Sequence, residues 1–115
     1  MIQLALTDAS YTSTLRELLE RDGGSADSVE FPDSDRAEVL VLDMEHLRRI
    51  PLPLPHPERV VLIAGNRTAD LEQAWIAGLE SVVLRDDPIS MAVLAILCAR
   101  LRHSGAVRRD LGQKA

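Results

Sequence analysis

Short apolar runs alternate with helical patterns along this chain. The clearest run is Val39-Leu40-Val41-Leu42, which contains no polar residue. A run without alternation is typical of a strand that is buried on both faces, as in a parallel sheet. Four further runs predict strands, at residues 2–6, 28–31, 60–63 and 82–84.

Helical spacing separates these runs. Leu15, Leu18 and Leu19 predict a helix after the first run, with Ser10 or Thr12 as its N-cap. A second helix has its apolar face at Leu71, Ala74, Trp75 and Gly78, and Trp75 is expected to anchor it on the sheet. The last helix opens at Pro88 and runs to about residue 103.

The connections on either side of the third strand are unusual. Only seven residues separate Phe31 from Val39, which is short for a parallel crossover. After Asp43, residues 44–50 predict about two turns of helix. Proline at every second position from 51 to 57 then predicts an extended arm, because proline lacks an N–H. Strands alternating with helices predict an α/β protein with a parallel sheet and helices on both faces.

Composition and charge limit the kinds of protein that this chain can be. The chain of 115 residues suits one domain, which we place at 1–104, followed by a polar tail at 105–115. The net charge of −5 argues against nucleic acid or an anionic membrane as the main partner. The single cysteine, Cys98, excludes an internal disulfide, and we expect it to be buried in the last helix. No signal peptide or membrane span is visible, so a cytoplasmic location is expected.

Asp43 is the first candidate for chemistry. It follows the 39–42 run directly, at the carboxyl end of the predicted strand. Open α/β sheets place their ligands at that edge. The three histidines show no ligand spacing and are expected to lie at the surface.

Four segments together resemble the receiver domain of bacterial response regulators. They are Ile2-Gln3-Leu4-Ala5-Leu6-Thr7-Asp8, Val39-Leu40-Val41-Leu42-Asp43, Ala74-Trp75-Ile76-Ala77-Gly78-Leu79-Glu80 and Val82-Val83-Leu84-Arg85-Asp86. The resemblance implies a flavodoxin-like three-layer sandwich with a five-stranded parallel sheet in the order 2-1-3-4-5. The second and third helices are expected to be shortened.

The resemblance also implies a phosphoryl site, with Asp43 as the phosphoacceptor for a histidine kinase. Such a site holds Mg²⁺ on neighbouring acidic residues and neutralises the phosphoryl oxygens with a cation. In this chain Asp8, Asp43 and the backbone carbonyl of Glu45 are the candidate ligands of a weak Mg²⁺ site. Arg85 is the candidate basic residue.

Several of the positions that the resemblance assigns to that site carry other residues. Thr7 replaces the first acidic residue, Ala64 replaces the Ser or Thr, Val82 replaces the aromatic residue, and Arg85 replaces the Lys. Arginine keeps the charge but is not interchangeable with lysine. We therefore favour loss of regulated phosphorylation. Arg85 is expected either to pair with Asp8 or Asp43, or to point to solvent near Asp86 and Asp87.

The last helix is apolar on all sides from Met91 to Ala99. One face of this helix carries Val93, Leu97, Arg100 and Leu101. If that face packs inward, then Ala92, Ile96 and Ala99 remain outside as an interface.

Three hypotheses follow. The leading one is an atypical, pseudo-receiver-like single-domain response regulator. It would not be an enzyme, and it would bind a protein partner or a second copy through the last helix and fifth strand, largely without phosphorylation. The alternative is a working phosphoacceptor in a two-component phosphorelay, with Asp43 receiving phosphate. The third is an unrelated flavodoxin-like ligand-binding domain, for which the sequence offers no glycine-rich phosphate loop.

Overall fold

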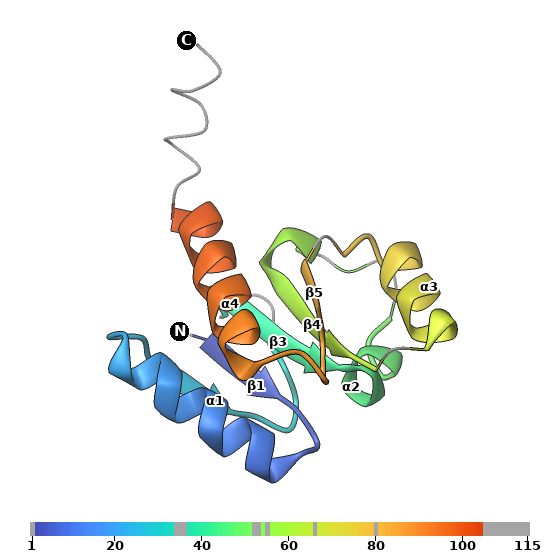
Figure 1. Cartoon of the computed structure of the whole chain (residues 1–115). Helices are drawn as coiled ribbons and strands as arrows, with labels where there is room; N and C mark the ends of the chain where they lie inside the picture. The colour runs from blue at the N-terminus through green and yellow to red at the C-terminus, as the bar shows by residue number, and fades with distance from the viewer. Residues whose placement is uncertain are drawn as a thin grey trace, which may run out of the picture.

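A parallel sheet lies between two layers of helices (Figure 1). The computed structural model describes residues 2–33, 37–51, 54, 56–65, 67–79 and 81–104. Of residues 103 and 104 it describes the backbone only. The strands are β1 (Ile2–Ala5), β2 (Ala26–Ser28), β3 (Val39–Asp43), β4 (Val60–Ala64) and β5 (Ser81–Leu84). The helices are α1 (Ala9–Arg21), α2 (Met44–Arg48), α3 (Thr68–Ile76) and α4 (Ile89–Ser104), with a 3₁₀ turn, η1 (Pro57–Arg59). The predicted tail, 105–115, lies outside the described residues.

The sheet confirms the predicted topology. Its five strands are parallel and lie in the order β2-β1-β3-β4-β5. Helices α1 and α4 cover one face and α2 and α3 cover the other, which makes the flavodoxin-like sandwich of receiver domains (Figure 1). The carboxyl ends of β1, β3, β4 and β5 therefore meet at one edge of the sheet.

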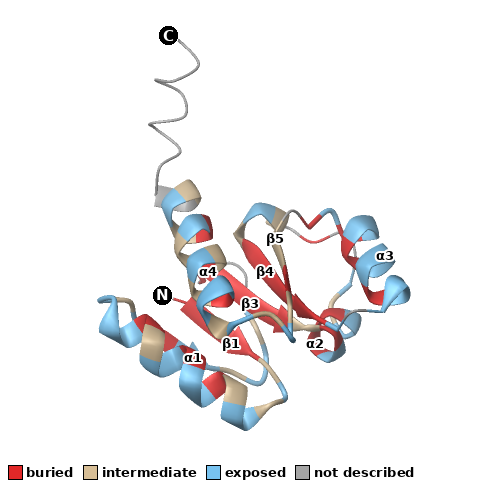
Figure 2. Ribbon diagram, viewed as in Figure 1, coloured by how far each residue is buried: buried red, intermediate tan, exposed pale blue. Residues whose placement is uncertain are grey.

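The central strands are buried on both faces because each alternate side chain enters a different core. Val39 and Val41 pack with α1 and α4, whereas Leu40 and Leu42 pack toward α2 and α3. The same alternation holds in β4. Figure 2 shows the resulting buried band through the middle of the molecule. An uninterrupted apolar run is the expected sequence for such a strand.

Two local predictions were wrong in detail. The N-cap of α1 is Asp8, not Ser10 or Thr12, because the Asp8 carboxylate accepts from the Tyr11 N–H. The second strand is Ala26–Ser28 and ends before Phe31, which is 81% exposed.

The connections around β3 are short, as expected. Helix α2 has only five residues, which confirms the shortened third helix. Between β2 and β3 the described residues, 29–33 and 37–38, contain no helix. Part of the proline arm lies outside the described residues. Of the part that is described, Leu54 is buried in the core on the α2 and α3 side, and Pro57 opens the turn η1.

Helix α4 faces the sheet with the side that was predicted to be its interface. Ala92, Ile96 and Ala99 are all 0% exposed and pack in the core, so the prediction that they form an exposed interface was wrong. Both faces of this helix are apolar, and periodicity alone could not choose between them. The two alanines allow the helix to approach the sheet closely around Ile96. Cys98, expected to be buried, is exposed.

Helix α3 is rotated relative to the prediction in the same way. Its buried residues are Asp70 and Ala74, and Ala77 follows on the same side. Trp75 is 84% exposed and does not anchor the helix. Instead, α3 contacts the core through the small residues Ala74 and Ala77. Asp70 also forms an ion pair with Arg48 of α2. Within the described part of the chain, no helix is long and apolar enough to cross a membrane.

Candidate functional site

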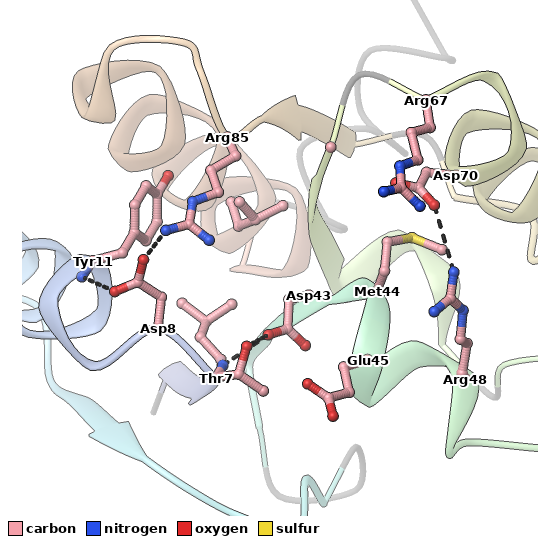
Figure 3. Close-up of a pocket in the computed structure, with 13 residues that line it drawn as sticks. Thr7, Asp8, Tyr11, Asp43, Met44, Glu45, Arg48, Arg67, Asp70 and Arg85 are labelled. Carbon is pink, nitrogen blue, oxygen red and sulfur yellow. Dashed lines mark hydrogen bonds and ion pairs between the residues drawn. The ribbon is translucent and has the colours of Figure 1, made fainter.

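An open cleft of about 420 Å³ lies at the carboxyl edge of the sheet (Figure 3). Its position follows from the strand register, which pairs Ala5 with Leu42, Asp43 with Ile63, and Ala64 with Leu84. The residues that follow these strand ends therefore converge. Those of the predicted site that line the cleft are Thr7, Asp8, Asp43, Glu45 and Arg85.

Asp43 is held by four hydrogen bonds from two residues. The backbone N–H and the hydroxyl of Thr7 donate to Oδ2, at 2.7 and 2.8 Å. The backbone N–H and Nδ1 of His46 meet Oδ1, at 3.0 and 2.7 Å. Because an ionised carboxylate only accepts, Nδ1 carries the proton in this contact. Asp43 is thus the N-cap of α2, and both of its oxygens are engaged.

These bonds set the charge state of Asp43. Partial burial by itself would raise the pKa of its carboxyl group. The hydrogen bonds from His46 and Thr7 outweigh the burial and lower the pKa below the ordinary aspartate value. The group is therefore a carboxylate whose negative charge is stabilised by hydrogen bonds from Thr7 and His46.

Asp8 and Arg85 form an ion pair across the cleft, from the N-terminus of α1 to the end of β5. Figure 3 shows Arg85 directed toward Asp8 and Tyr11, and Thr7 against Asp43. The other oxygen of Asp8 caps α1, and the Arg85 guanidinium lies 6.0 Å from the centre of the Tyr11 ring. Of the two expectations for Arg85, the structure selects pairing with Asp8.

Ala64 and Val82 bring no polar side chain to the cleft, and the carboxylate of Glu45, which lines it, is engaged with a neighbour on its own helix. Ala64 is fully buried in the core, and its carbonyl accepts from the Arg85 N–H at 2.8 Å. Val82 is partly buried against the core on the α3 side. The carboxylate of Glu45 pairs with Arg49 at 3.5 Å.

Three residues at or beside the cleft were not predicted from the sequence, namely His46, Asp70 and Tyr11. His46 is 6% exposed and holds Asp43, although a surface position was expected. The spacing offered a signal, since a side chain three residues after an N-cap can reach back to it, as Glu or Gln does in a capping box. Asp70 pairs with Arg48 at 3.6 Å across the cleft. This contact joins two helices far apart in the sequence and had no local signal.

Tyr11 also lines the cleft. Burial, followed by the nearby charge of Asp87, raises the pKa of its phenol. Its hydroxyl is buried and makes no hydrogen bond within the described part of the protein. The cleft is therefore closed on this side by an apolar ring and an arginine rather than by a group that could accept a proton at neutral pH.

Solved receiver domains share this fold. The response regulator receiver protein from Burkholderia phymatum matches with a TM-score of 0.62 at 19% identity, over 86% of this chain and 93% of that chain. The receiver domain of Francisella response regulator 1452 matches with a TM-score of 0.66 at 12% identity, over 88% and 96%. A structure described as adenylate cyclase from Rhodopirellula baltica matches with a TM-score of 0.67 at 20% identity, over 98% and 96%.

At these identities the likeness establishes the receiver fold and leaves the activity open. No family model and no curated protein sequence matches the chain.

Proposed function

We propose that this chain is an atypical receiver-like module in cytoplasmic signal transduction, which binds a protein partner or a second copy without being phosphorylated and without enzymatic activity. One observation carries the proposal. The hydroxyl of Thr7, at a position that the resemblance assigns to an acidic metal ligand, donates directly to Asp43. A carboxylate there could not make this bond.

The charges of the cleft support the same conclusion. The Thr7 and His46 donors occupy both oxygens of Asp43, and Arg85 forms an ion pair with Asp8. A metal ion or a phosphoryl group would have to displace these contacts. Ala64 stands where the resemblance assigns a Ser or Thr whose hydroxyl would bind a phosphoryl oxygen. The alanine side chain offers no such donor.

A weak Mg²⁺ site at Asp8, Asp43 and the Glu45 carbonyl stays a prediction. Among the described residues, no group of three or more acidic, histidine or cysteine side chains is arranged to hold a metal ion. Glu45 lies in the first turn of α2, where backbone carbonyls point along the axis toward the C-terminal end of the helix. We therefore expect Mg²⁺ to bind only at millimolar concentration or above. Calorimetric titration of the wild type and Asp8→Asn measures this.

The phosphorylation test uses a small phosphodonor with Mg²⁺ and intact-protein mass spectrometry. We expect no stable phosphoprotein from the wild type or from Asp43→Asn. The matched variant Thr7→Asp with Ala64→Ser restores the acidic residue and the hydroxyl, and we expect it to gain a phosphoryl group that Asp43→Asn removes. A wild-type phosphoprotein that is lost in Asp43→Asn would instead establish the working phosphoacceptor.

A further inference from the structure

The edge strand β2 presents backbone hydrogen-bonding groups on its outer side. Among the described residues, β1 is its only neighbour in the sheet. The carbonyl of Ser25 and the N–H of Val29 both bond to β1. Because backbone groups alternate in direction along a strand, those of Ala26 and Ser28 point away from β1. Such a row of backbone groups can pair with another extended segment.

The outer side of β2 is also acidic. Asp27 and Glu30 are exposed, and neither forms an ion pair among the residues that the structure describes. Asp22, the C-cap of α1, adds a third exposed carboxylate near the start of the strand. Pairing with the β2 strand of a second copy would bring like charges together, which is unfavourable. The edge therefore fits an extended segment that carries basic side chains.

The chain itself carries such a segment directly after α4. Residues 105–111 have the sequence Gly-Ala-Val-Arg-Arg-Asp-Leu, with two adjacent basic residues, Arg108 and Arg109. They lie outside the described residues, but α4 defines where they start. One turn before the end of α4, the Arg100 guanidinium lies against Gly24, at 3.3 Å from the place that a Cβ would take. Since Gly24 comes two residues before β2, the segment starts beside the amino end of this strand.

A strand added at this edge obeys the handedness of parallel sheets. The crossover from β1 to β2 has its helix, α1, on the face that also holds α4 (Figure 1). A path from β5 through α4 to the outer side of β2 crosses the sheet in the same direction and on the same face, so it has the same right-handed sense. Three residues beyond Ser104 span about 10 Å, roughly twice the spacing between neighbouring strands. Residue 107 is therefore within reach of β2.

We propose that residues 107–111 bind along the outer edge of β2 as a sixth parallel strand, with Arg108 beside Asp27. Side chains alternate between the two faces along each strand. This register places Val107 beside Ala26, which is buried on the face that α1 and α4 cover. It places Arg108 on the opposite face, where Asp27 is exposed. A shift by one residue would move Arg108 to the core face, so the order of apolar and basic residues selects this register.

The contact goes beyond the proposed function and does not depend on it. It closes the β2 edge, so a partner strand can pair there only after it displaces residues 107–111. An exposed ion pair such as Arg108 with Asp27 contributes little to stability. We therefore expect the segment to leave the edge without unfolding of the sheet.

Hydrogen exchange by NMR on the full chain tests the contact. The amides of Ala26 and Ser28 are the readout, because an added strand gives both of them a hydrogen-bond partner. We expect them to exchange about tenfold more slowly in the wild type than in Arg108→Glu, and still faster than the amides of β3. The matched control, Lys114→Glu, makes the same change of charge outside the paired segment and should leave both rates unchanged. Equal rates in all three proteins would overturn the inference.

A charge exchange tests the register. Asp27→Arg combined with Arg108→Glu restores opposite charges at the proposed pair, so slow exchange of the Ala26 and Ser28 amides should return. Asp27→Arg alone should speed their exchange as Arg108→Glu does. A double variant that exchanges as fast as either single variant would show that these two residues are not neighbours.

Cross-linking decides whether the segment belongs to the same chain or to a second copy. Asp27→Cys and Arg108→Cys are combined with Cys98→Ser and treated with a short bismaleimide at micromolar protein. The proposal predicts a cross-linked monomer. The matched pair, Glu72→Cys on the exposed side of α3 with Arg108→Cys, should not cross-link. Cross-linked dimers in place of monomers, or equal yields from both pairs, would refute the intramolecular contact.

Discussion

Asp43 shows how a carboxylate at a strand end can serve the fold. Its four hydrogen bonds satisfy the N-terminus of α2 and fix the buried His46 side chain. Hydrogen bonds to a charged group each contribute about 1.5–3 kcal/mol. The residue contributes to stability whether or not it has a role in signalling.

The lowered pKa of Asp43 gives a testable pH dependence. The pKa of the Asp43 carboxyl is lower in the folded state than in the unfolded chain. At pH values between these two pKa values, the unfolded state therefore binds more protons than the folded state. The stabilisation is fully present above the ordinary aspartate pKa of about 3.9 and is lost as the pH falls through the lowered value. We expect Asp43→Asn to reduce the unfolding free energy by about 1–2 kcal/mol at pH 7, as for a weakened N-cap, and by less near pH 3.

Urea denaturation at the two pH values measures this difference. Asp27→Asn, at an exposed position in β2, is the control and should change the free energy of unfolding little at either pH. A deficit of Asp43→Asn that is as large at pH 3 as at pH 7 would contradict the assigned hydrogen bonds.

The Thr7 hydroxyl can be tested at the same scale. Thr7→Val keeps the shape and removes one donor to Asp43, so we expect a loss of about 1.5 kcal/mol at pH 7, the low end for a bond to a charged group because this contact is exposed. It should also raise the pKa of the Asp43 carboxyl, which NMR titration reports directly. An unchanged pKa would mean that the hydroxyl contributes nothing to the carboxylate.

At the scale of elements, α4 has two apolar faces and uses only one in the core. Ile96 is fully buried between two alanines, while Leu94 is more than half exposed. We therefore expect truncation of the Ile96 side chain to cost far more stability than truncation of the Leu94 side chain.

Ile96→Ala should destabilise the protein by about 2–5 kcal/mol, because it leaves a cavity against the sheet. Leu94→Ala should cost about 0.5 kcal/mol or less at concentrations where the chain is monomeric. Denaturation in urea measures both. Equal costs would mean that α4 packs on the other face.

The end of α3 depends on one backbone conformation. Gly78 has a φ of +77°, a left-handed value that other residues adopt at a cost. Gly78→Ala should therefore reduce stability by about 1 kcal/mol, and Gly78→Asn by less, because asparagine tolerates this region. A thermal melt in which both variants match the wild type would argue against this turn.

The whole molecule is held by the three inner strands. β1, β3 and β4 have hydrogen-bonded neighbours on both sides, whereas β2 and β5 are the edges of the sheet. Amide exchange should therefore be slowest in β3 and its two neighbours and faster in β2, which has only three residues. Hydrogen exchange by NMR resolves this, and protection of β2 equal to that of β3 would contradict it.

The apolar runs placed four of the five strands, the exception being β2, and the lengths of the segments between them indicated the shortened helices. Asp43 and Asp8 could be placed at one edge because parallel strands bring their carboxyl ends together. These features depend on periodicity and chain order, which are local properties of the sequence.

Only the tertiary structure decided which face of α4 and of α3 is buried. Where a helix is apolar on both sides, the choice depends on how closely small residues such as Ala92 and Ala99 let it approach the sheet. The partners of Asp43 and Asp8 were decided in the same way. Thr7 and Arg85 are distant in sequence from the carboxylates they satisfy or pair with, and only the folded sheet brings these groups within hydrogen-bonding reach.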